Sequence, residues 1–242
     1  MYYPAVSTYA CSMNWPTSTS QLFHAQQLLA AAVPDPWHIP PESPSVGGVF
    51  VCFERKGGGS GEGGDAGWAG ACVVQDAHLV AGVAVTGRAG GSYRSGYLAL
   101  REGPLLEAAL RALGEPPAVL LVNATGLDHP RRAGLALHLG AVLGIPTIGV
   151  THRPLLATGD WPASKERGAT SELLLRGEVV GCWVRTRAGC RPLAVHAGWR
   201  TSPESGRALV LAAASGGRTP EPLREARRLA RTARSDAEQR PR

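Results

Sequence analysis

The spacing of apolar residues in the first third of the chain predicts one helix followed by three strands. Residues 17–33 place apolar side chains at helical spacing, after Ser and Thr residues that suit a helix N-cap. Short apolar runs with β-branched residues follow at 47–53, 69–74 and 78–85, and such runs are typical of strands.

The remaining two thirds of the chain alternate between strand-like and helical patterns. Helices are predicted at 102–113 and 131–143, and strands at 118–123 and 146–150. The first of these strands is apolar on both faces, as a central parallel strand is. The later predicted elements are strands at 171–177, 178–187 and 191–198, and helices at 203–214 and 221–231. This order predicts a mixed sheet with helices on its faces.

The chain length and the loop composition predict one domain with two tails. With 242 residues and 44% apolar content, the chain can fill a single substantial core. We expect an extended arm at 1–14, one domain at 15–233 and a charged tail at 234–242. The proline-rich segment 34–45 is predicted to be a connector, and the glycine-rich run 56–67 a flexible hairpin loop.

Charge and cysteine content indicate the class of partner and the cellular compartment. The net charge is +6, and Lys56 and Lys165 are the only lysines, so arginine supplies nearly all of the positive charge. Arginine suits phosphate or carboxylate, which favours an anionic partner, although a compositional bias of the source explains the pattern equally well. Five scattered cysteines form no disulfide framework, and no apolar run is long enough for a membrane span. We therefore predict a cytoplasmic protein without membrane contact.

Six colinear segments and the first helix resemble the endonuclease V family over about residues 15–232. The segments are VGGVFVCF (46–53), YLALREGP (97–104), LLVNATGLDHPRRAGLALHLG (120–140), PTIGVTHRPL (146–155), GEVVGCWVRTRAGCRPLAVHAGWR (177–200) and EPLREARRLA (221–230). The resemblance implies a ribonuclease-H-like α/β fold of the endonuclease V type. It also implies cleavage of DNA or RNA beside deaminated bases, chiefly inosine, with magnesium or manganese.

The chain departs from the family pattern where that pattern supplies metal ligands. Phe50 stands where members have the aspartate of GVDVS, and Asn123 where they have the aspartate of DGQG or DGNG. Glu102 retains the acidic residue of the family's FRE segment. Because magnesium prefers an octahedral shell of carboxylate, phosphate and water, one carboxylate is too few. We therefore expect no metal cofactor and no ordinary metal-dependent nuclease activity.

Other family positions are also changed. His152 replaces a lysine, and Trp199 replaces the histidine of SPGHR, whereas His129 is retained. The family's strand-separating wedge PYIP reads SYRS at 92–95, so only Tyr93 remains of it. This change puts base eversion in doubt.

A different site built in the same place is one interpretation of the retained polar residues. Glu102, Asp128, His129 and His152 are expected to lie near one another, and this set suits zinc better than magnesium. The alternative is that Asp128 and His129 only cap or anchor a helix beginning at Pro130. A metal-free acid and base role for Glu102 with His152 also stays open.

Arginine pairs and one cysteine complete the candidates. Arg131 and Arg132, at a predicted helix start, would either bind phosphate or remain solvated surface charges. The arginines of 224–234 are more typical of the outer face of a docked helix than of direct nucleic-acid contact. Cys52 lies beside Phe50 and is either a nucleophile or, more commonly for a buried strand cysteine, inert.

Three hypotheses of function follow. The first is a non-cleaving family member that binds nucleic acid or another anionic ligand. The second is an enzyme, or a subunit of a heteromeric enzyme, that acts on a small anionic molecule in specialised metabolism; Phe50, Asn123, His152 and Trp199 would together line its pocket. The third is a structural or regulatory partner of another protein. An active inosine-directed endonuclease of repair is a further alternative.

Overall fold

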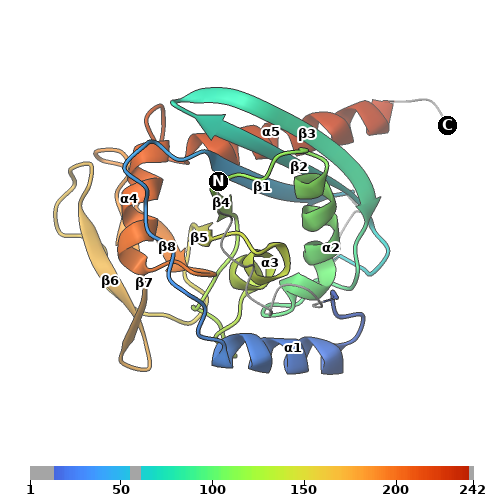
Figure 1. Ribbon diagram of the computed structural model, residues 1–242, viewed down its shortest axis with the longest axis horizontal. Coiled ribbons are helices and arrows are strands. Elements are labelled where there is room, and N and C mark those ends of the chain that lie inside the picture. The colour runs from blue at the N-terminus through green and yellow to red at the C-terminus, as the bar shows by residue number, and fades with distance from the viewer. Residues whose placement is uncertain (1–13, 55–60, 240–242) are drawn as a thin grey trace, which may run out of the picture.

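A single eight-stranded mixed sheet forms the centre of the molecule (Figure 1). The computed structural model describes residues 14–54 and 61–239, and the strands lie in the order β3-β2-β1-β4-β5-β8-β7-β6. The strands are β1 (Val46–Phe53), β2 (Ala66–Gln75), β3 (His78–Arg88), β4 (Val119–Val122), β5 (Thr147–Thr151), β6 (Thr170–Leu175), β7 (Glu178–Val184) and β8 (Leu193–Ala197). Only β1–β4 and β4–β5 pair in parallel. The predicted mixed sheet and ribonuclease-H-like α/β class are confirmed.

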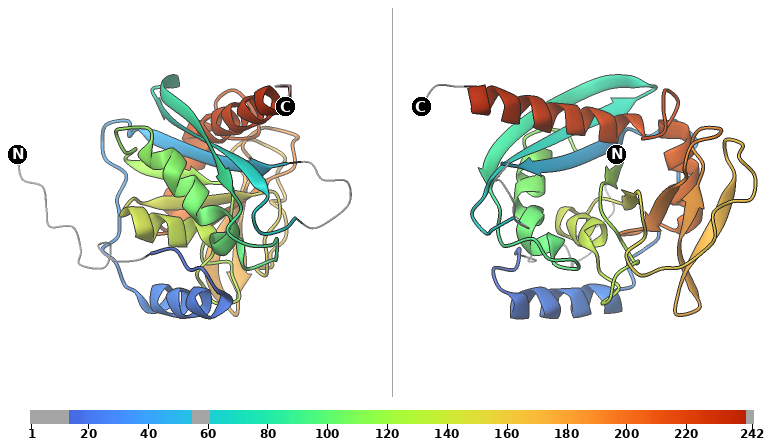
Figure 2. Two further views of the ribbon diagram at one scale, coloured as in Figure 1. Left: turned by 90° about the vertical axis from the view of Figure 1, so that its right-hand side faces the viewer. Right: turned by 180° about the vertical axis from the view of Figure 1, so that it is seen from behind.

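Helices cover both faces of this sheet. They are α1 (Thr19–Ala31), α2 (Leu98–Arg111), α3 (Leu135–Leu143), α4 (Pro203–Ala213) and α5 (Glu221–Gln239). Helices α2 and α3 pack on one face through Leu120 and Val122, whereas α4 and the start of α5 pack on the other through Leu121. Helix α1 lies outside α2 and α3, at the opposite extreme of the molecule from α5 (Figures 1 and 2).

Three helix boundaries differ from those predicted by more than two residues. Helix α2 begins at Leu98, four residues before the predicted start, and it accommodates Pro104 in its interior. Helix α3 begins at Leu135 instead of 131, because Arg132 has a φ of 56°, a left-handed conformation that a right-handed helix cannot include. Helix α5 continues to Gln239, so most of the predicted charged tail is helical.

The glycine-rich loop is partly anchored. Its residues 56–60, like 1–13 of the predicted arm, lie outside the described residues. Within the described remainder, the Asp65 carboxylate accepts a hydrogen bond from the Arg101 guanidinium at 3.1 Å, and both side chains are buried. Arg101 also donates to the carbonyls of Glu62 and Gly91 and lies 4.0 Å from the Phe53 ring centroid. Flexibility was therefore the wrong expectation for residues 61–65.

None of the helices in the described ranges combines the length and apolar character that a bilayer crossing requires.

We expect Asp65→Ala to lower the free energy of unfolding by ~3–5 kcal/mol, because it leaves the Arg101 guanidinium buried without its carboxylate. Urea denaturation followed by circular dichroism measures this change. Glu115→Gln removes an exposed carboxylate and is the matched control, with an expected change within about 0.5 kcal/mol. Equal midpoints for the two variants would contradict the anchoring role of Asp65.

Candidate functional site

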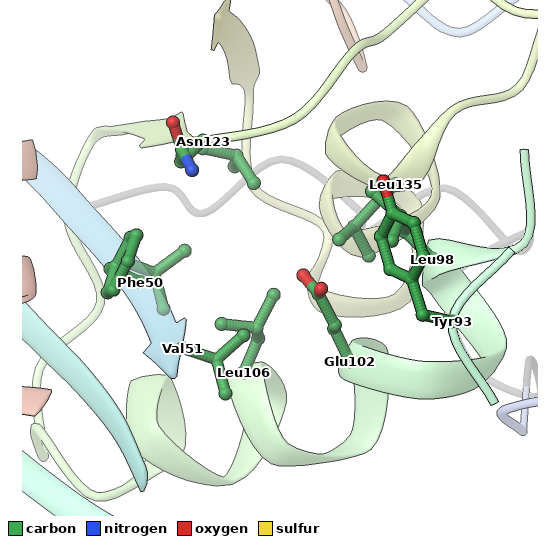
Figure 3. Close-up of a pocket in the computed structure, with 10 residues that line it drawn as sticks. Phe50, Val51, Tyr93, Leu98, Glu102, Leu106, Asn123 and Leu135 are labelled. Atoms are coloured by element: carbon green, nitrogen blue, oxygen red, sulfur yellow. The ribbon is translucent and has the colours of Figure 1, made fainter. Parts of the chain in front are cut away.

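A cavity of about 290 Å³ opens where β1, β4 and α2 meet (Figure 3). The pairing of β1 with β4 places Val49 opposite Val122, so the next residues, Phe50 and Asn123, lie side by side at the end of β4. The lining residues are Val49, Phe50, Val51, Tyr93, Leu98, Glu102, Leu106, Val122, Asn123 and Leu135. The structure thus brings together Glu102, Phe50, Asn123 and Tyr93.

Among the described residues that line this cavity, Glu102 is the only one with a carboxylate. It projects from α2 into the space bounded by Phe50, Asn123 and Leu135 (Figure 3). Within the described part of the chain, its carboxylate has no hydrogen-bond or ion-pair partner. Burial among apolar side chains raises the pKa of Glu102 from 4.5 to about 7, against the opposing charge of Arg101.

Phe50 separates this cavity from helix α5. Its ring packs toward Cys72, Ala226 and Leu229 on the α5 face of the sheet. The guanidinium carbons of Arg227 and Arg231 lie 5.0 and 6.0 Å from the ring centroid. The α5 arginines thus divide into a pair beside Phe50 and others, such as Arg224, that are joined to glutamates of the helix itself.

Cys52 also faces α5, and its thiol donates to the Ala230 carbonyl at 3.5 Å. It is not among the residues that line the Glu102 cavity. The nucleophile interpretation of Cys52 therefore has no support from its position.

The donor set around Glu102 is small. The Glu102 carboxylate, the Asn123 amide and the Phe50 ring line the cavity together. Among the described residues, no three His, Cys, Asp or Glu side chains group closely enough to hold a metal ion. The expected zinc-type cluster of Glu102, Asp128, His129 and His152 is therefore not formed.

Asp128 is a buried anchor for the loop after β5. Its carboxylate accepts backbone N–H groups from Leu155, Leu156 and Ala157 at 2.6, 2.8 and 2.7 Å. These three bonds occupy the side chain, and Asp128 does not line the Glu102 cavity. Asp128 is thus an anchor, as one of the two interpretations expected, but it anchors the loop at 155–157 and not a helix beginning at Pro130.

His196, which the sequence analysis missed, lies beside Asp128. It is fully buried in β8, with Nδ1 3.7 Å from the Asp128 carboxylate and Nε2 2.8 Å from Thr151 Oγ1. Because the Thr151 hydroxyl donates its proton to the Arg153 carbonyl, the His196 Nε2–H is the donor to Thr151. Burial lowers the pKa of His196 to about 4 although Asp128 opposes this. The signal available in the sequence was a single histidine within an otherwise apolar strand, all five residues of which are buried.

His129 holds the loop that carries Tyr93. Its Nε2–H donates to the Gly96 carbonyl at 3.1 Å, and its Nδ1 accepts the Arg131 N–H at 3.2 Å. Burial lowers the pKa of His129 to about 4, so the ring is neutral at neutral pH. His129 also lines a second cavity of about 110 Å³, which adjoins the first because Tyr93 and Leu98 line both.

Arg131 and Arg132 are engaged within the protein. Arg131 donates to Gln26 and to the Gly96 carbonyl and lies 4.1 Å from the Phe23 ring centroid. Arg132 pairs with Glu178 at 2.5 Å. Since helix α3 begins only at Leu135, the prediction that these arginines stand at a helix start is wrong.

Neither His152 nor Trp199 lines the cavity of Phe50 and Asn123. His152 follows β5 and lines a separate cavity. Trp199 is 7% exposed and packs in the core beneath α3. Because β8 runs antiparallel to β5, the residues after it reach the opposite edge of the sheet, where the Trp199 N–H donates to Thr147 Oγ1. The predicted four-residue pocket is therefore wrong.

Comparison with known proteins identifies close relatives. The family model for Endonuclease V matches residues 37–228. An Endonuclease V of Streptomyces coelicolor is 40% identical over 228 residues, covering 93% of this chain and 94% of that protein. The crystal structure of Endonuclease V from Streptomyces avermitilis has a TM-score of 0.82 at 33% identity and covers 96% of this chain and 100% of its own.

A more distant structure shares the fold. Endonuclease V of Ciona intestinalis, solved in complex with a 24mer DNA that contains an inosine, has a TM-score of 0.76 at 21% identity. The similarity covers 90% of this chain and 98% of that one.

We expect Glu102→Gln to stabilise the protein at pH 8 and to change it little at pH 4. Since the folded-state pKa of about 7 exceeds the usual 4.5, the folded protein keeps a proton that the unfolded chain releases between these values. Stability therefore falls as pH rises through this window. The gain at pH 8 should be about 1–3 kcal/mol, because solvent in the open cavity screens part of the charge. Thermal denaturation of the variant and the unchanged protein at pH 8 and pH 4 measures this gain. The same stability difference between the two proteins at both pH values would contradict the raised pKa of Glu102.

We expect Asp128→Asn to lower the free energy of unfolding by about 2–4 kcal/mol, since three N–H groups lose a charged acceptor and one then faces an amide donor. Urea denaturation measures the loss. The exposed Asp160→Asn is the control. Equal stability of the two variants would show that Asp128 does not anchor the loop.

Proposed function

Because this chain belongs to the endonuclease V family, matched over residues 37–228, we propose that it binds nucleic acid at the edge of the sheet without metal-dependent cleavage. The observation that carries the proposal is the single carboxylate of Glu102 beside Phe50 and Asn123. A nucleic-acid strand that reaches this cavity carries one negatively charged phosphate per nucleotide, and the arginine-rich chain supplies the opposite charge.

The donor set does not fit a magnesium ion. Magnesium is small, loses water reluctantly and requires near-octahedral oxygen ligands, which anionic carboxylates supply best. The Asn123 amide offers one neutral oxygen, and the Phe50 ring offers none. The raised pKa of Glu102 leaves even this carboxyl partly protonated near neutral pH. These three features support loss of the metal site.

Binding of nucleic acid is supported by charge and by the relatives. The net charge is +6, and Arg227 and Arg231 lie at the Phe50 side of the cavity. The Ciona intestinalis structure holds an inosine-containing DNA on the same fold. Tyr93, exposed by 49% at the cavity rim, offers an aromatic face on which a base can stack.

The other hypotheses receive less support. An enzyme or heteromeric subunit of specialised metabolism was inferred from a shared pocket of Phe50, Asn123, His152 and Trp199, which the fold divides among three places. A purely structural or regulatory role has no feature of its own in its favour. Retained cleavage beside inosine has the support of the relatives' name, and the cleavage assay below tests it directly.

We expect the protein to leave inosine-containing DNA and RNA intact in magnesium or manganese, and Phe50→Asp with Asn123→Asp to cleave them. The double change restores two anionic ligands beside Glu102, which allows a hard divalent ion to bind and activate water. Gel electrophoresis of end-labelled strands measures cleavage. Adding Glu102→Gln to the double variant is the control and should abolish the gain. Metal-dependent cleavage by the unchanged protein, lost in Glu102→Gln, would refute the proposal.

Binding is expected to be salt-dependent and insensitive to divalent metal. Fluorescence anisotropy with inosine-containing and plain strands, at about 50 and 200 mM salt, measures the slope of affinity against salt. Two or more phosphate contacts should weaken single-strand binding severalfold over this range. If neither strand shows salt-dependent binding, the proposal of a nucleic-acid function is refuted.

A further inference from the structure

A third cavity, here called the Trp161 cavity, lies at the same edge of the sheet as the Glu102 cavity. Its volume is about 680 Å³, and its lining residues are His152, Arg153, Pro154, Trp161, Trp183, Arg191, Pro192 and Arg218. They come from the β5–β6 connection, strand β7, the β7–β8 connection and the connection from α4 to α5. No carboxylate of the described residues lines this cavity.

Two tryptophans form one wall of the cavity. Trp183 is 5% exposed, and its indole N–H donates to the Gly159 carbonyl at 2.9 Å. Trp161 is 52% exposed and meets Trp183 edge to face, with ring centroids 6.2 Å apart. The buried ring thus supports the exposed one, which presents a large apolar face to solvent.

Three arginines give the cavity a positive charge. Arg218 donates to the carbonyls of Arg191 and Pro192 at 2.7 and 2.9 Å, which holds its guanidinium in place. Arg153 and Arg191 are exposed, and within the described ranges no acidic side chain pairs with either guanidinium. Their N–H donors are therefore available to an anion.

The topology joins this cavity to the first one. Asn123 directly follows β4 and His152 directly follows β5, and these parallel neighbours end at one edge of the sheet. Because Val122 pairs with Gly149, Asn123 is level with Val150 on the adjacent strand, and His152 lies two residues beyond that position. Burial and the charges of Arg218 and Arg227 lower the pKa of His152.

We propose that the Trp161 cavity binds one nucleotide of a single nucleic-acid strand, whose base stacks on Trp161 and whose phosphate is held by Arg153 and Arg191. This inference rests on the proposed nucleic-acid function and adds a second contact to it. The same strand passes Arg227 and His152 and reaches the Glu102 cavity.

The combination of groups selects this ligand class. A phosphate alone would use the arginines and leave the Trp161 face unoccupied. A purely apolar ligand would leave three guanidinium groups beside it without a counter-charge. A nucleotide supplies an aromatic ring and an anion joined by a sugar, and a stacked base requires no particular sequence. Continuity of positive charge toward Phe50 favours a strand over a free nucleotide.

Fluorescence anisotropy of a labelled oligothymidylate of about 15 nucleotides tests the proposal. Trp161→Ala should weaken binding about 5- to 100-fold, the usual range for loss of one stacked base, and Trp161→Phe should retain most of the affinity. Arg153→Ala with Arg191→Ala should lower the slope of log affinity against log salt by about 0.7, for the one phosphate that both arginines hold. Arg176→Ala, which removes an exposed arginine from the hairpin turn between β6 and β7, should change neither quantity.

The outcomes separate the two proposals. If the unchanged protein binds no oligothymidylate, both the nucleic-acid function and the second contact fail. If it binds, but the Trp161 and arginine variants behave like Arg176→Ala, only the second contact fails. Thymidine monophosphate that binds through Trp161, while oligothymidylate affinity stays independent of Trp161, would assign the cavity to free nucleotides and overturn the strand proposal.

Discussion

Parallel pairing of β1, β4 and β5 is the constraint on which the arrangement of both cavities depends. These strands are the centre of the sheet, and β4 is buried along all four of its residues. Because the three strands run in one direction, the residues at or after their carboxyl ends lie at one edge. The register of β1, β4 and β5 places Phe50, Asn123 and His152 at this edge. Strand β4 ends at Val122, opposite Val49, so β1 has no β4 partner beyond that point.

Buried polar side chains hold the irregular backbone around this edge. The connections after β4 and β5 lack regular ladders, so their N–H and carbonyl groups require other partners. Asp128 supplies an acceptor for three N–H groups, and His129 and Arg131 donate to the Gly96 carbonyl. Several residues with the chemistry of a catalytic or ligand-binding group therefore act as structural anchors, which explains why they are buried and fully engaged.

This arrangement keeps the family's scaffold while changing the chemistry of its edge. An aromatic ring and an amide line the cavity beside Glu102, and this carboxyl group lies among apolar side chains that favour its neutral form. Positive charge persists along the same edge, from Arg227 and Arg231 to Arg153 and Arg191. Recognition of an anionic strand requires only this charge and exposed aromatic faces, whereas hydrolysis requires a bound metal with anionic ligands.

The sequence by itself determined the element types, the mixed sheet and the family, since apolar periodicity and colinear motifs are local properties of the chain. Tertiary structure alone decided which polar residues meet. Trp199 and His152 are both near strand ends, but the antiparallel direction of β8 sends Trp199 to the opposite edge. Likewise, Trp161, Arg191 and Arg218 are separated by up to 57 residues in the chain and converge only through folding. Contacts of this kind depend on strand direction and packing, which side-chain patterns along a single chain do not specify.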